Sequence, residues 1–378
     1  MIPTIGLCMI VKDEAKVIVR CLESVRPITD YVLIVDTGSS DDTIGVIERH
    51  LAQQGLAGEV ARCDWVDFAY NRTFALARLR EKADIDYCLM IDADEVLQYA
   101  DDFDPAAFKA GLSHDLYDIT TRYGGVNYPR PQLFRNRLDF SFRGVLHEFL
   151  ERPEGELTRG PARGLWNVPT PDGARSQNPR KFDDDAEMLR RVLAAGVDEP
   201  WLEARYQFYL AQSLRDAGRP AEALEAYAVR AAQGFTADEV FYSHFQVGRL
   251  AERLGRPAGE IVTAYLDAFQ ASPNRAEPLH ALASYYRRQD KLRLAFEFAR
   301  IGRALPKPTW GFCVENWIYD YAMQDEYGVA AYWAGAYAEC LEACDQLLAN
   351  PALPEADRPR IEANRAFAVT KLAEQAAG

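Results

Sequence analysis

The feature that most constrains this chain is the stretch 86–95, in which an apolar run ends abruptly in carboxylates. The run 87–91 predicts a buried strand of a parallel sheet. Side chains alternate along a strand, so Asp92 and Asp94 are expected to project to the same side, with the small Ala93 between them. Open α/β sheets bind ligands at the carboxyl ends of their central strands. The stretch therefore predicts a ligand site at the end of such a strand.

Asp92 and Asp94 are predicted metal ligands. Two carboxylates this close repel each other unless a cation lies between them or one of them stays protonated. Hard oxygen ligands suit Mg²⁺ or Mn²⁺, and such ions usually also hold substrate phosphates. The alternative is a solvated acidic loop, which is the commoner meaning of an isolated Asp-x-Asp, so the neighbouring motifs decide between the two.

The first part of the chain alternates between apolar runs and helical periodicity. The spacing predicts strands over 4–11, 31–35 and 58–62, and helices over 14–25, 42–54 and 69–82. Strands that alternate with helices are typical of a parallel sheet covered by helices. We therefore expect an α/β N-terminal domain with a Rossmann-like, mainly parallel sheet.

Two further polar residues stand where this fold binds ligands. Asp36 ends the second predicted strand and precedes a Gly-Ser turn over 37–43, a recurring layout for recognising a nucleotide base or ribose. Arg72 lies in the first turn of the helix 69–82, where the helix dipole disfavours positive charge, so it is a candidate partner for a carboxylate or phosphate. The structural alternatives are a turn capped by Asp36 and a plain ion pair of Arg72 with an acid of the preceding loop.

Four motifs together resemble glycosyltransferase family 2, the inverting enzymes of the GT-A fold, and more narrowly its branch with a C-terminal tetratricopeptide region. The motifs are residues 7–14, residues 34–43, Asp67-Phe68 with Asn71-Arg72, and residues 91–95. The resemblance covers about the first 150 residues. It implies a nucleotide-diphosphate sugar as donor, with UDP-sugars favoured, a divalent metal at Asp92 and Asp94, and inversion at the anomeric carbon.

The same resemblance assigns the donor-binding residues. It implies that Asp36 contacts the nucleoside and that the turn 11–14 frames the base. The full set expected to bind the donor is Val11, Asp13, Glu14, Asp36, Gly38, Arg72, Asp92 and Ala93.

Residues 142–148 resemble the segment that closes the sugar end of the family's site. A neutral imidazole suits Mn²⁺, so His147 is expected to be a further metal ligand. Glu148 is expected to be the catalytic general base that an inverting displacement needs. A hydrogen-bonded core histidine and a salt-bridged glutamate are the structural alternatives, and the two roles are open to exchange.

From residue 179 onward the hydrophobic period is helical and it repeats. Gly-Arg-Pro-Ala occurs at 218–221 and again at 255–258, close to the spacing of about 34 residues typical of tetratricopeptide repeats. Small residues at i, i+4 in later units, Ala295 with Ala299 and Cys340 with Cys344, predict helix packing. We expect a GT-A domain over 1–175 and an all-α tetratricopeptide-like domain over 176–378.

The Pro- and Gly-rich stretch 153–179 is predicted to be an irregular, exposed boundary. Leu165 and Trp166 favour the alternative that part of it is a strand or a lid near the site.

Stacked repeats present an extended concave surface, suited to an elongated acceptor or to a second copy of the chain. We therefore expect a saccharide or a peptide or protein as acceptor, and a homodimer or a protein partner bound through the repeats. Some of the aromatic residues of this half are expected on that surface: Tyr206, Tyr209, Tyr242, Tyr285, Tyr286, Trp310, Trp317 and Trp333.

Charge and composition exclude several classes. The formal charge of −14 argues against binding to nucleic acid or to an anionic membrane surface. No apolar run is long enough to be a transmembrane segment, and the first residues do not resemble a signal peptide. Seven cysteines without a C-x-x-C pair fit a reducing compartment. We expect a cytoplasmic protein, which reaches the inner face of the membrane only through a partner or acceptor.

The sequence thus predicts a metal-dependent inverting glycosyltransferase that acts on a saccharide, a lipid-linked glycan, or a peptide or protein. One alternative is a helical-repeat adaptor with a degenerate glycosyltransferase domain, but Asp36, Asp92, Asp94 and Glu148 are all present. A nucleotidyltransferase would need a basic, Gly-rich loop after the first strand, where this chain has Lys-Asp-Glu at 12–14.

Overall fold

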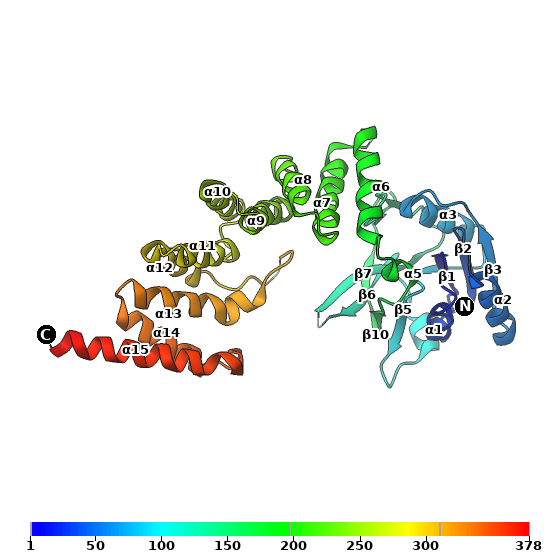
Figure 1. Ribbon diagram of the computed structural model, residues 1–378. Coiled ribbons are helices and arrows are strands. Elements are labelled where there is room, and N and C mark those ends of the chain that lie inside the picture. Colours follow the sequence, from blue (N-terminus) through cyan, green and yellow to red (C-terminus); the bar gives the residue numbers. More distant parts are fainter. Residues whose placement is uncertain (1, 125, 197, 310, 378) are drawn as a thin grey trace. The chain divides into compact units, whose positions relative to one another are not determined.

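The computed structural model describes residues 2–124, 126–196, 198–309 and 311–377; Trp310, expected on the surface of the repeats, lies outside them. The chain divides into two compact units, Met1–Ala195 and Gly196–Gly378. Strands lie only in the first unit within the described ranges, and the second is helical (Figure 1). The division falls after α6 (Lys181–Ala195), beyond the residue 175 expected from the sequence.

The first unit is built on an eight-stranded sheet in the order β3-β2-β1-β4-β7-β6-β10-β5. β1 pairs in parallel with β2 and β4, β2 with β3, and β10 with β6, whereas the other three pairings are antiparallel. The predicted α/β class with a mainly parallel sheet is confirmed. The strands are β1 (Ile5–Val11), β2 (Tyr31–Asp36), β3 (Ala57–Arg62), β4 (Tyr87–Met90), β5 (Glu95–Tyr99), β6 (Leu116–Tyr123), β7 (Val126–Arg135) and β10 (Arg159–Pro169), with a separate hairpin of β8 (Ser141–Arg143) and β9 (Phe149–Glu151).

Helices cover both faces of this sheet. α1 (Ile18–Val25), α2 (Thr43–Gln54) and α4 (Pro105–Ala110) pack on one face, and α3 (Phe68–Arg80) packs on the other. α3 lies close to β1 because Gly6 has no side chain: a Cβ there would be 2.9 Å from side-chain atoms of both Leu79 and Ile85. This close packing fixes the position of the helix that carries Arg72.

The stretch predicted to be an irregular boundary contains β10, so that prediction is wrong for residues 159–169, and the alternative of a strand around Leu165 and Trp166 is confirmed. The strand lies inside the sheet between β6 and β5. Leu165 is buried in the core, and the Arg122 guanidinium lies 3.7 Å from the centre of the Trp166 ring. Prolines and glycines are unfavourable inside a regular strand, so they argued against a strand here. In the structure the pairing of β10 with β6 is irregular between Pro161 and Trp166, and this irregularity accommodates them.

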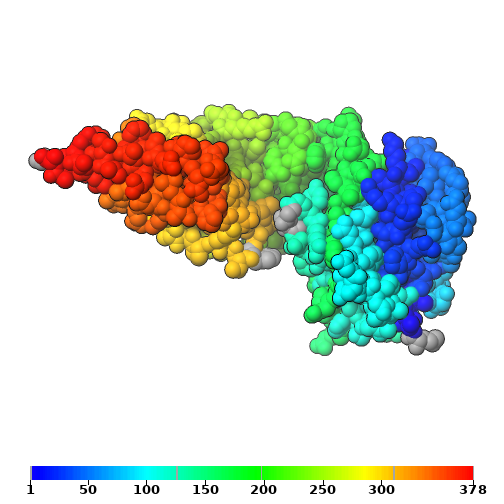
Figure 2. All heavy atoms as spheres, turned by 90° about the horizontal axis from the view of Figure 1, so that it is seen from below, coloured from blue at the N-terminus to red at the C-terminus, as the bar shows by residue number. Residues whose placement is uncertain are grey.

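The second unit is a row of helical hairpins in which successive helices pack on one another (Figure 1). In the space-filling view its colours follow the sequence from green to red (Figure 2). The repeated Gly-Arg-Pro-Ala motifs form the turns of two hairpins, where Gly218 and Gly255 have φ of +73° and +65°. The predicted all-α tetratricopeptide-like domain is confirmed. Its helices are α7 (Pro200–Asp216), α8 (Pro220–Ala232), α9 (Ala237–Arg253), α10 (Ala258–Ala271), α11 (Glu277–Arg288), α12 (Leu292–Arg303), a π-helical turn (Ile318–Ala322), α13 (Met323–Trp333), α14 (Tyr337–Ala349) and α15 (Arg358–Ala377).

The small residues of the later hairpins are packing residues, as predicted. Ala295, Ala299, Cys340 and Cys344 are all buried between helices, and all seven cysteines are free thiols. Within the ranges that the structure describes, no helix combines the length and the apolarity needed to cross a bilayer.

Candidate active site

Two turns at the carboxyl ends of β1 and β2 are joined by hydrogen bonds. The parallel register places Val11 opposite Asp36, and the Val11 carbonyl oxygen accepts hydrogen bonds from the Thr37 backbone N (2.9 Å) and Oγ1 (3.0 Å). Asp13 has a positive φ of 58°, and its Oδ1 accepts from the Ser40 backbone N at 2.6 Å. These contacts hold the predicted base-framing turn rigidly against the Gly-Ser turn.

Asp36 has one carboxylate oxygen that accepts a hydrogen bond from none of the described residues. Its Oδ1 accepts hydrogen bonds from the backbone N atoms of Gly38 (3.0 Å) and Ser39 (3.1 Å), and Gly38 has the positive φ of 105° that this turn requires. Its Oδ2 is buried and accepts no hydrogen bond from any described residue. Buried carboxylate oxygens are normally hydrogen-bonded, so Oδ2 suits a donor supplied by a ligand.

Arg72 bridges the predicted metal ligand Asp92 and the predicted general base Glu148. The cap of α3 is Asp67, whose Oδ1 accepts a hydrogen bond from the Tyr70 backbone N at 2.7 Å, and Arg72 is the fifth residue of the helix, just past its first turn. Its side chain is 9% exposed, with Nη2 2.6 Å from Asp92 Oδ1 and Nε 2.7 Å from Glu148 Oε1. Arg72 therefore joins the end of β4 to the β8–β9 hairpin.

The ion pairs of this bridge determine the ionisation of Arg72 and Asp92. Burial opposes ionisation of Arg72, but Asp92 and Glu148 outweigh it and raise the pKa of the guanidinium. Burial likewise opposes ionisation of Asp92, but Arg72 and Arg130 hold the pKa of this carboxyl below its usual range. Asp92 is thus an anion at neutral pH.

Asp94 and Glu14 are half-buried carboxyl groups that have no such arginine partner in the described ranges. Burial, together with the neighbouring Asp92 and Glu95, raises the pKa of Asp94 to about 6. Burial also raises the pKa of Glu14 to about 7, with the charges of Asp94 and Asp92 acting in the same direction. The structure thus gathers acids that repel one another, which is the arrangement that a bound cation stabilises.

A segment after β10 completes this acidic region, and the sequence did not identify it. The Asp94 carbonyl oxygen accepts hydrogen bonds from the Thr170 backbone N (2.7 Å) and Oγ1 (2.6 Å). The Ala174 backbone N donates to Glu14 Oε1 at 3.2 Å, and a Cβ on Gly173 would lie 2.8 Å from Asp94 Oδ2. The available signal was Thr-Pro-Asp-Gly at 170–173, a turn sequence directly after an apolar run.

Arg130 is a second residue that the sequence did not identify. It lies on β7 and forms an ion pair with the buried Glu95, whose Oε2 accepts a hydrogen bond from the Asp92 backbone N at 3.2 Å. Arg130 therefore stabilises the turn that presents Asp92 and Asp94, from a strand whose place in the sheet is not evident from the sequence.

His147, the third predicted metal ligand, directly precedes Glu148 in the chain. It lies exposed in the loop between β8 and β9, with a φ of 51°. The part of the chain that the structure describes contains no group of three or more His, Cys, Asp or Glu side chains able to hold a metal ion. Mg²⁺, however, is usually bound by one or two carboxylates together with waters and substrate phosphates, so Asp92 and Asp94 fit as its protein ligands.

The predicted residues thus fall into two neighbouring groups at one end of the sheet. Val11, Asp13, Asp36 and Gly38 lie at the ends of β1 and β2. The second group, around the end of β4, consists of Glu14, Arg72, Asp92, Ala93, Asp94 and Glu148.

Comparisons with known proteins bear on the same residues. The sequence model of the family described as Glycosyl transferase family 2 matches residues 7–141. A TPR repeat-containing protein of Synechococcus elongatus is 33% identical over 152 residues, which cover 39% of this chain and 35% of that protein. An uncharacterised glycosyltransferase of Rickettsia conorii is 33% identical over 93 residues, covering 25% of this chain and 29% of that protein.

Among solved structures, S. aureus TarS 1–349 in complex with UDP-GlcNAc covers 68% of this chain and 93% of its own length, at 15% identity and a TM-score of 0.35. The matched part of the chain spans 35% and 29% of the two curated relatives.

Proposed function

We propose that this chain, whose residues 7–141 belong to glycosyltransferase family 2, is a metal-dependent inverting transferase that uses a nucleotide-diphosphate sugar. The observation that carries the proposal is the half-buried cluster of acids at the end of β4, where Asp94 and Glu14 have raised pKa values beside the ionised Asp92. An adaptor with a degenerate domain would have no reason to keep this arrangement, because partly desolvated carboxylates that repel one another destabilise a fold.

The nucleoside is assigned to the ends of β1 and β2. Asp36 Oδ2 would accept a hydrogen bond from the base or ribose, since it is buried and unsatisfied by the described residues. The turn from Val11 to Glu14 would frame the base, and its hydrogen bonds to the 37–43 turn preform that frame. UDP-sugars are the favoured donors.

The diphosphate is assigned to the carboxylates after β4. Asp92 and Asp94 would hold Mg²⁺ or Mn²⁺, which neutralises charge on the departing nucleoside diphosphate. Arg72 orients the Asp92 carboxylate through the 2.6 Å contact to Oδ1. His147 is a further ligand in this proposal only if its loop brings the imidazole to the ion.

Glu148 is proposed as the general base. Its Oε1 is held by Arg72 Nε at 2.7 Å, and among the described residues only Arg72 is hydrogen-bonded to the carboxylate. Oε2 is therefore available to take the proton from the acceptor nucleophile as it attacks the anomeric carbon. A single in-line displacement of this kind inverts the configuration.

We assign donor chemistry to residues 1–175 and acceptor or partner binding to the helical region 176–378. The acceptor would be a saccharide, a lipid-linked glycan, or a peptide or protein, and the repeats would also suit a second copy of the chain. The proposed location is the cytoplasm, including the inner face of the membrane where the acceptor or a partner lies there.

A donor screen tests the proposed reaction. The full chain is incubated with a panel of UDP-, GDP- and TDP-sugars, with Mn²⁺, with Mg²⁺ or with EDTA, and the release of nucleoside diphosphate is measured. We expect release from at least one donor, strongest for a UDP-sugar, and only with a metal ion. Equal release in EDTA would refute the metal dependence, and no release from any donor, with no nucleotide binding, would refute the enzyme assignment.

The raised pKa values predict how stability depends on pH when metal is removed. The folded-state pKa values of Asp94 (about 6) and Glu14 (about 7) lie above the reference values of 3.8 and 4.5. Their contribution to stability is therefore fully present below pH about 4 and is lost as the pH rises through 6 and 7. We expect Tm in EDTA to fall over this range, and the fall to be smaller with Mn²⁺ or in Glu14→Gln. Asp102→Asn, which removes a carboxylate from an exposed turn, is the control, and its Tm should fall as that of the wild type does. If the Tm of Glu14→Gln fell as far as that of the wild type, the raised pKa could not be assigned to Glu14.

A further inference from the structure

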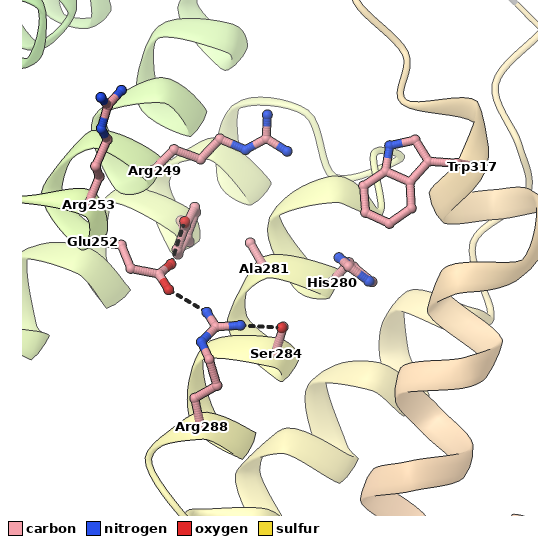
Figure 3. Close-up of a pocket in the computed structure, with 9 residues that line it drawn as sticks. Arg249, Glu252, Arg253, His280, Ala281, Ser284, Arg288 and Trp317 are labelled. Carbon is pink, nitrogen blue, oxygen red and sulfur yellow. Dashed lines mark hydrogen bonds and ion pairs between the residues drawn. The ribbon is translucent and has the colours of Figure 1, made fainter. Parts of the chain in front are cut away.

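A pocket in the helical unit has no part in the proposed donor chemistry. It has a volume of about 400 Å³ and is formed by α9, α10, α11 and the residue before the π-helical turn (Figure 3). That volume lies within the range of about 300 to 1,000 Å³ typical of small-molecule sites. The pocket opens on the surface made by the first helices of successive hairpins, the surface on which stacked repeats bind their ligands.

Arginines dominate its charge. Arg249 pairs with Glu315 at 2.7 Å and Arg288 pairs with Glu252, but both guanidinium groups stay about half exposed, and Figure 3 shows Arg249 reaching toward Trp317. Arg253 is exposed and forms no ion pair with an acid in the described ranges. The pocket is therefore positive in a chain whose formal charge is −14, so its attraction for anions is local.

Trp317 forms an aromatic wall of the pocket. Its indole is 43% exposed, and its ring is perpendicular to that of His280, with a centroid distance of 5.2 Å and an interplanar angle of 86°. Burial, reinforced by Arg249, lowers the pKa of His280 to about 4, so the imidazole is neutral at pH 7 and adds an N–H donor but no charge. A half-exposed indole face suits the apolar C–H face of a sugar ring.

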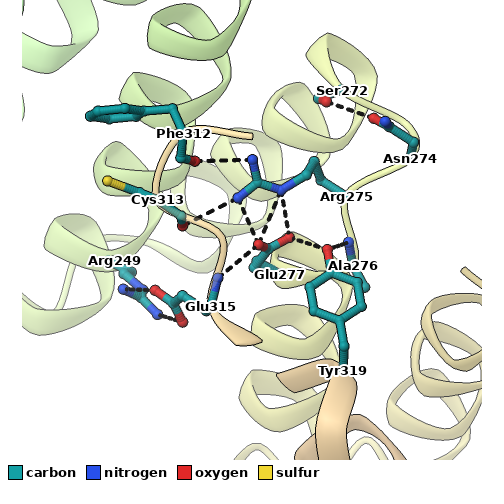
Figure 4. A network of polar contacts seen from close by, with 10 residues as sticks. All are labelled: Arg249, Ser272, Asn274, Arg275, Ala276, Glu277, Phe312, Cys313, Glu315 and Tyr319. Carbon is teal, nitrogen blue, oxygen red and sulfur yellow. Dashed lines mark hydrogen bonds and ion pairs between the residues drawn. The ribbon is translucent and has the colours of Figure 1, made fainter. Parts of the chain in front are cut away.

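The wall is fixed by a buried polar network (Figure 4). Arg275 and Glu277 form an ion pair in which the side chains are 4% and 0% exposed. Arg275 donates to the carbonyl oxygen of Phe312 at 3.1 Å, and Glu277 accepts from the Glu315 backbone N at 3.2 Å and from Tyr319 at 2.6 Å. The segment that carries Glu315 and Trp317 is therefore held in place before any ligand binds, which reduces the entropy lost on binding.

We propose that this pocket binds an acidic sugar, a ring that carries a carboxylate or a phosphate, as a recognition element of the acceptor. Guanidinium groups bind both anions with directed, charge-assisted hydrogen bonds, and the Trp317 face takes the ring. The assignment to the acceptor rests on the proposed glycosyltransferase function, whereas the binding of an acidic sugar does not.

Calorimetric titration of the full chain tests the proposal without using activity. The probes are glucose 6-phosphate, glucuronate, neutral glucose and inorganic phosphate. We expect saturable binding of one or both acidic sugars, with glucose and inorganic phosphate at least about tenfold weaker, because each lacks one of the two recognised features. The glucose 6-phosphate and glucuronate arms separate a phosphate-bearing from a carboxylate-bearing ligand.

Variants place the binding in this pocket. Trp317→Leu should weaken the binding of the acidic sugars about tenfold or more. Arg253→Gln should do the same, and it removes a surface charge without leaving an acid unpaired. The matched controls are Trp333→Leu (63% exposed) and Arg300→Gln, whose side chain is 58% exposed on α12; both should bind like the wild type.

Three results would overturn the proposal: no binding of either acidic sugar, glucose or phosphate bound as tightly as the acidic sugars, or unchanged binding in both pocket variants. Acidic-sugar binding in a chain that releases no nucleoside diphosphate would refute the proposed reaction but keep the pocket assignment.

Discussion

Glu148→Gln is expected to slow sugar transfer by about 10² to 10⁴-fold while donor and metal bind as in the wild type. The amide oxygen of glutamine can still accept the hydrogen bond from Arg72 Nε, so the bridge between α3 and the β8–β9 hairpin is kept. What is lost is the group that accepts the proton of the nucleophile. The measurement is kcat at saturating donor and acceptor, with donor affinity determined separately by calorimetry.

Glu151→Gln is the matched control for this variant. Glu151 lies in the same hairpin and pairs with Arg143 at 3.1 Å, with its side chain 41% exposed. It should transfer sugar at the wild-type rate. A wild-type kcat in Glu148→Gln would place the base elsewhere, and a loss of metal affinity with unchanged chemistry would mean that Glu148 and His147 have exchanged roles.

Asp94→Asn is expected to reduce metal-dependent donor binding by more than about 100-fold. Loss of residues that only support a metal ligand typically reduces affinity 10- to 100-fold, so loss of a ligand itself should exceed that. The fold should survive, because Thr170 bonds to the main-chain oxygen of Asp94, which the substitution leaves in place. In EDTA the variant should melt at a higher temperature than the wild type, since a half-buried charge repelled by Asp92 is removed.

The control for Asp94→Asn is Asp139→Asn, which removes a carboxylate that is 88% exposed and paired with Arg80. Its donor binding and its melting temperature in EDTA should stay close to those of the wild type, because surface ion pairs contribute little. If Asp94→Asn bound donor with unchanged dependence on Mn²⁺, the two-carboxylate metal site would have to be abandoned.

The site residues at the ends of the parallel strands were predictable from the sequence because the alternation of side chains and the parallel pairing of strands determine where they lie. Alternation along β4 and parallel pairing of β1 with β2 and β4 bring Val11, Asp36 and Asp92 to one end of the sheet. The helix periods located α1 to α3, and the turn glycines located the hairpins of the repeats. Each of these features depends on residues that are close together in the chain.

The remaining parts of the site depend on pairings between distant segments. Arg72 was expected to meet a carboxylate or a phosphate, but only the packing of α3 against β1 shows that it meets Asp92 and Glu148. Arg130 and the segment 170–174 reach the site because β7 pairs with β4, and β10 pairs with β5 and β6, all of which are distant from them in sequence. Nothing in the local pattern of the sequence specifies that order.

The position of β10 also has a consequence for how the protein is made. β5 is one of the two edge strands, and within the described residues its only strand partner is β10, which is translated well after it. During synthesis at about 5 to 20 residues per second, β5 leaves the ribosome several seconds before that partner exists. Until then, the acidic turn before β5 and the segment 170–174 have no means of meeting. The nascent domain can therefore assemble the nucleotide side of its site early, but its carboxylate side only when the last strand arrives.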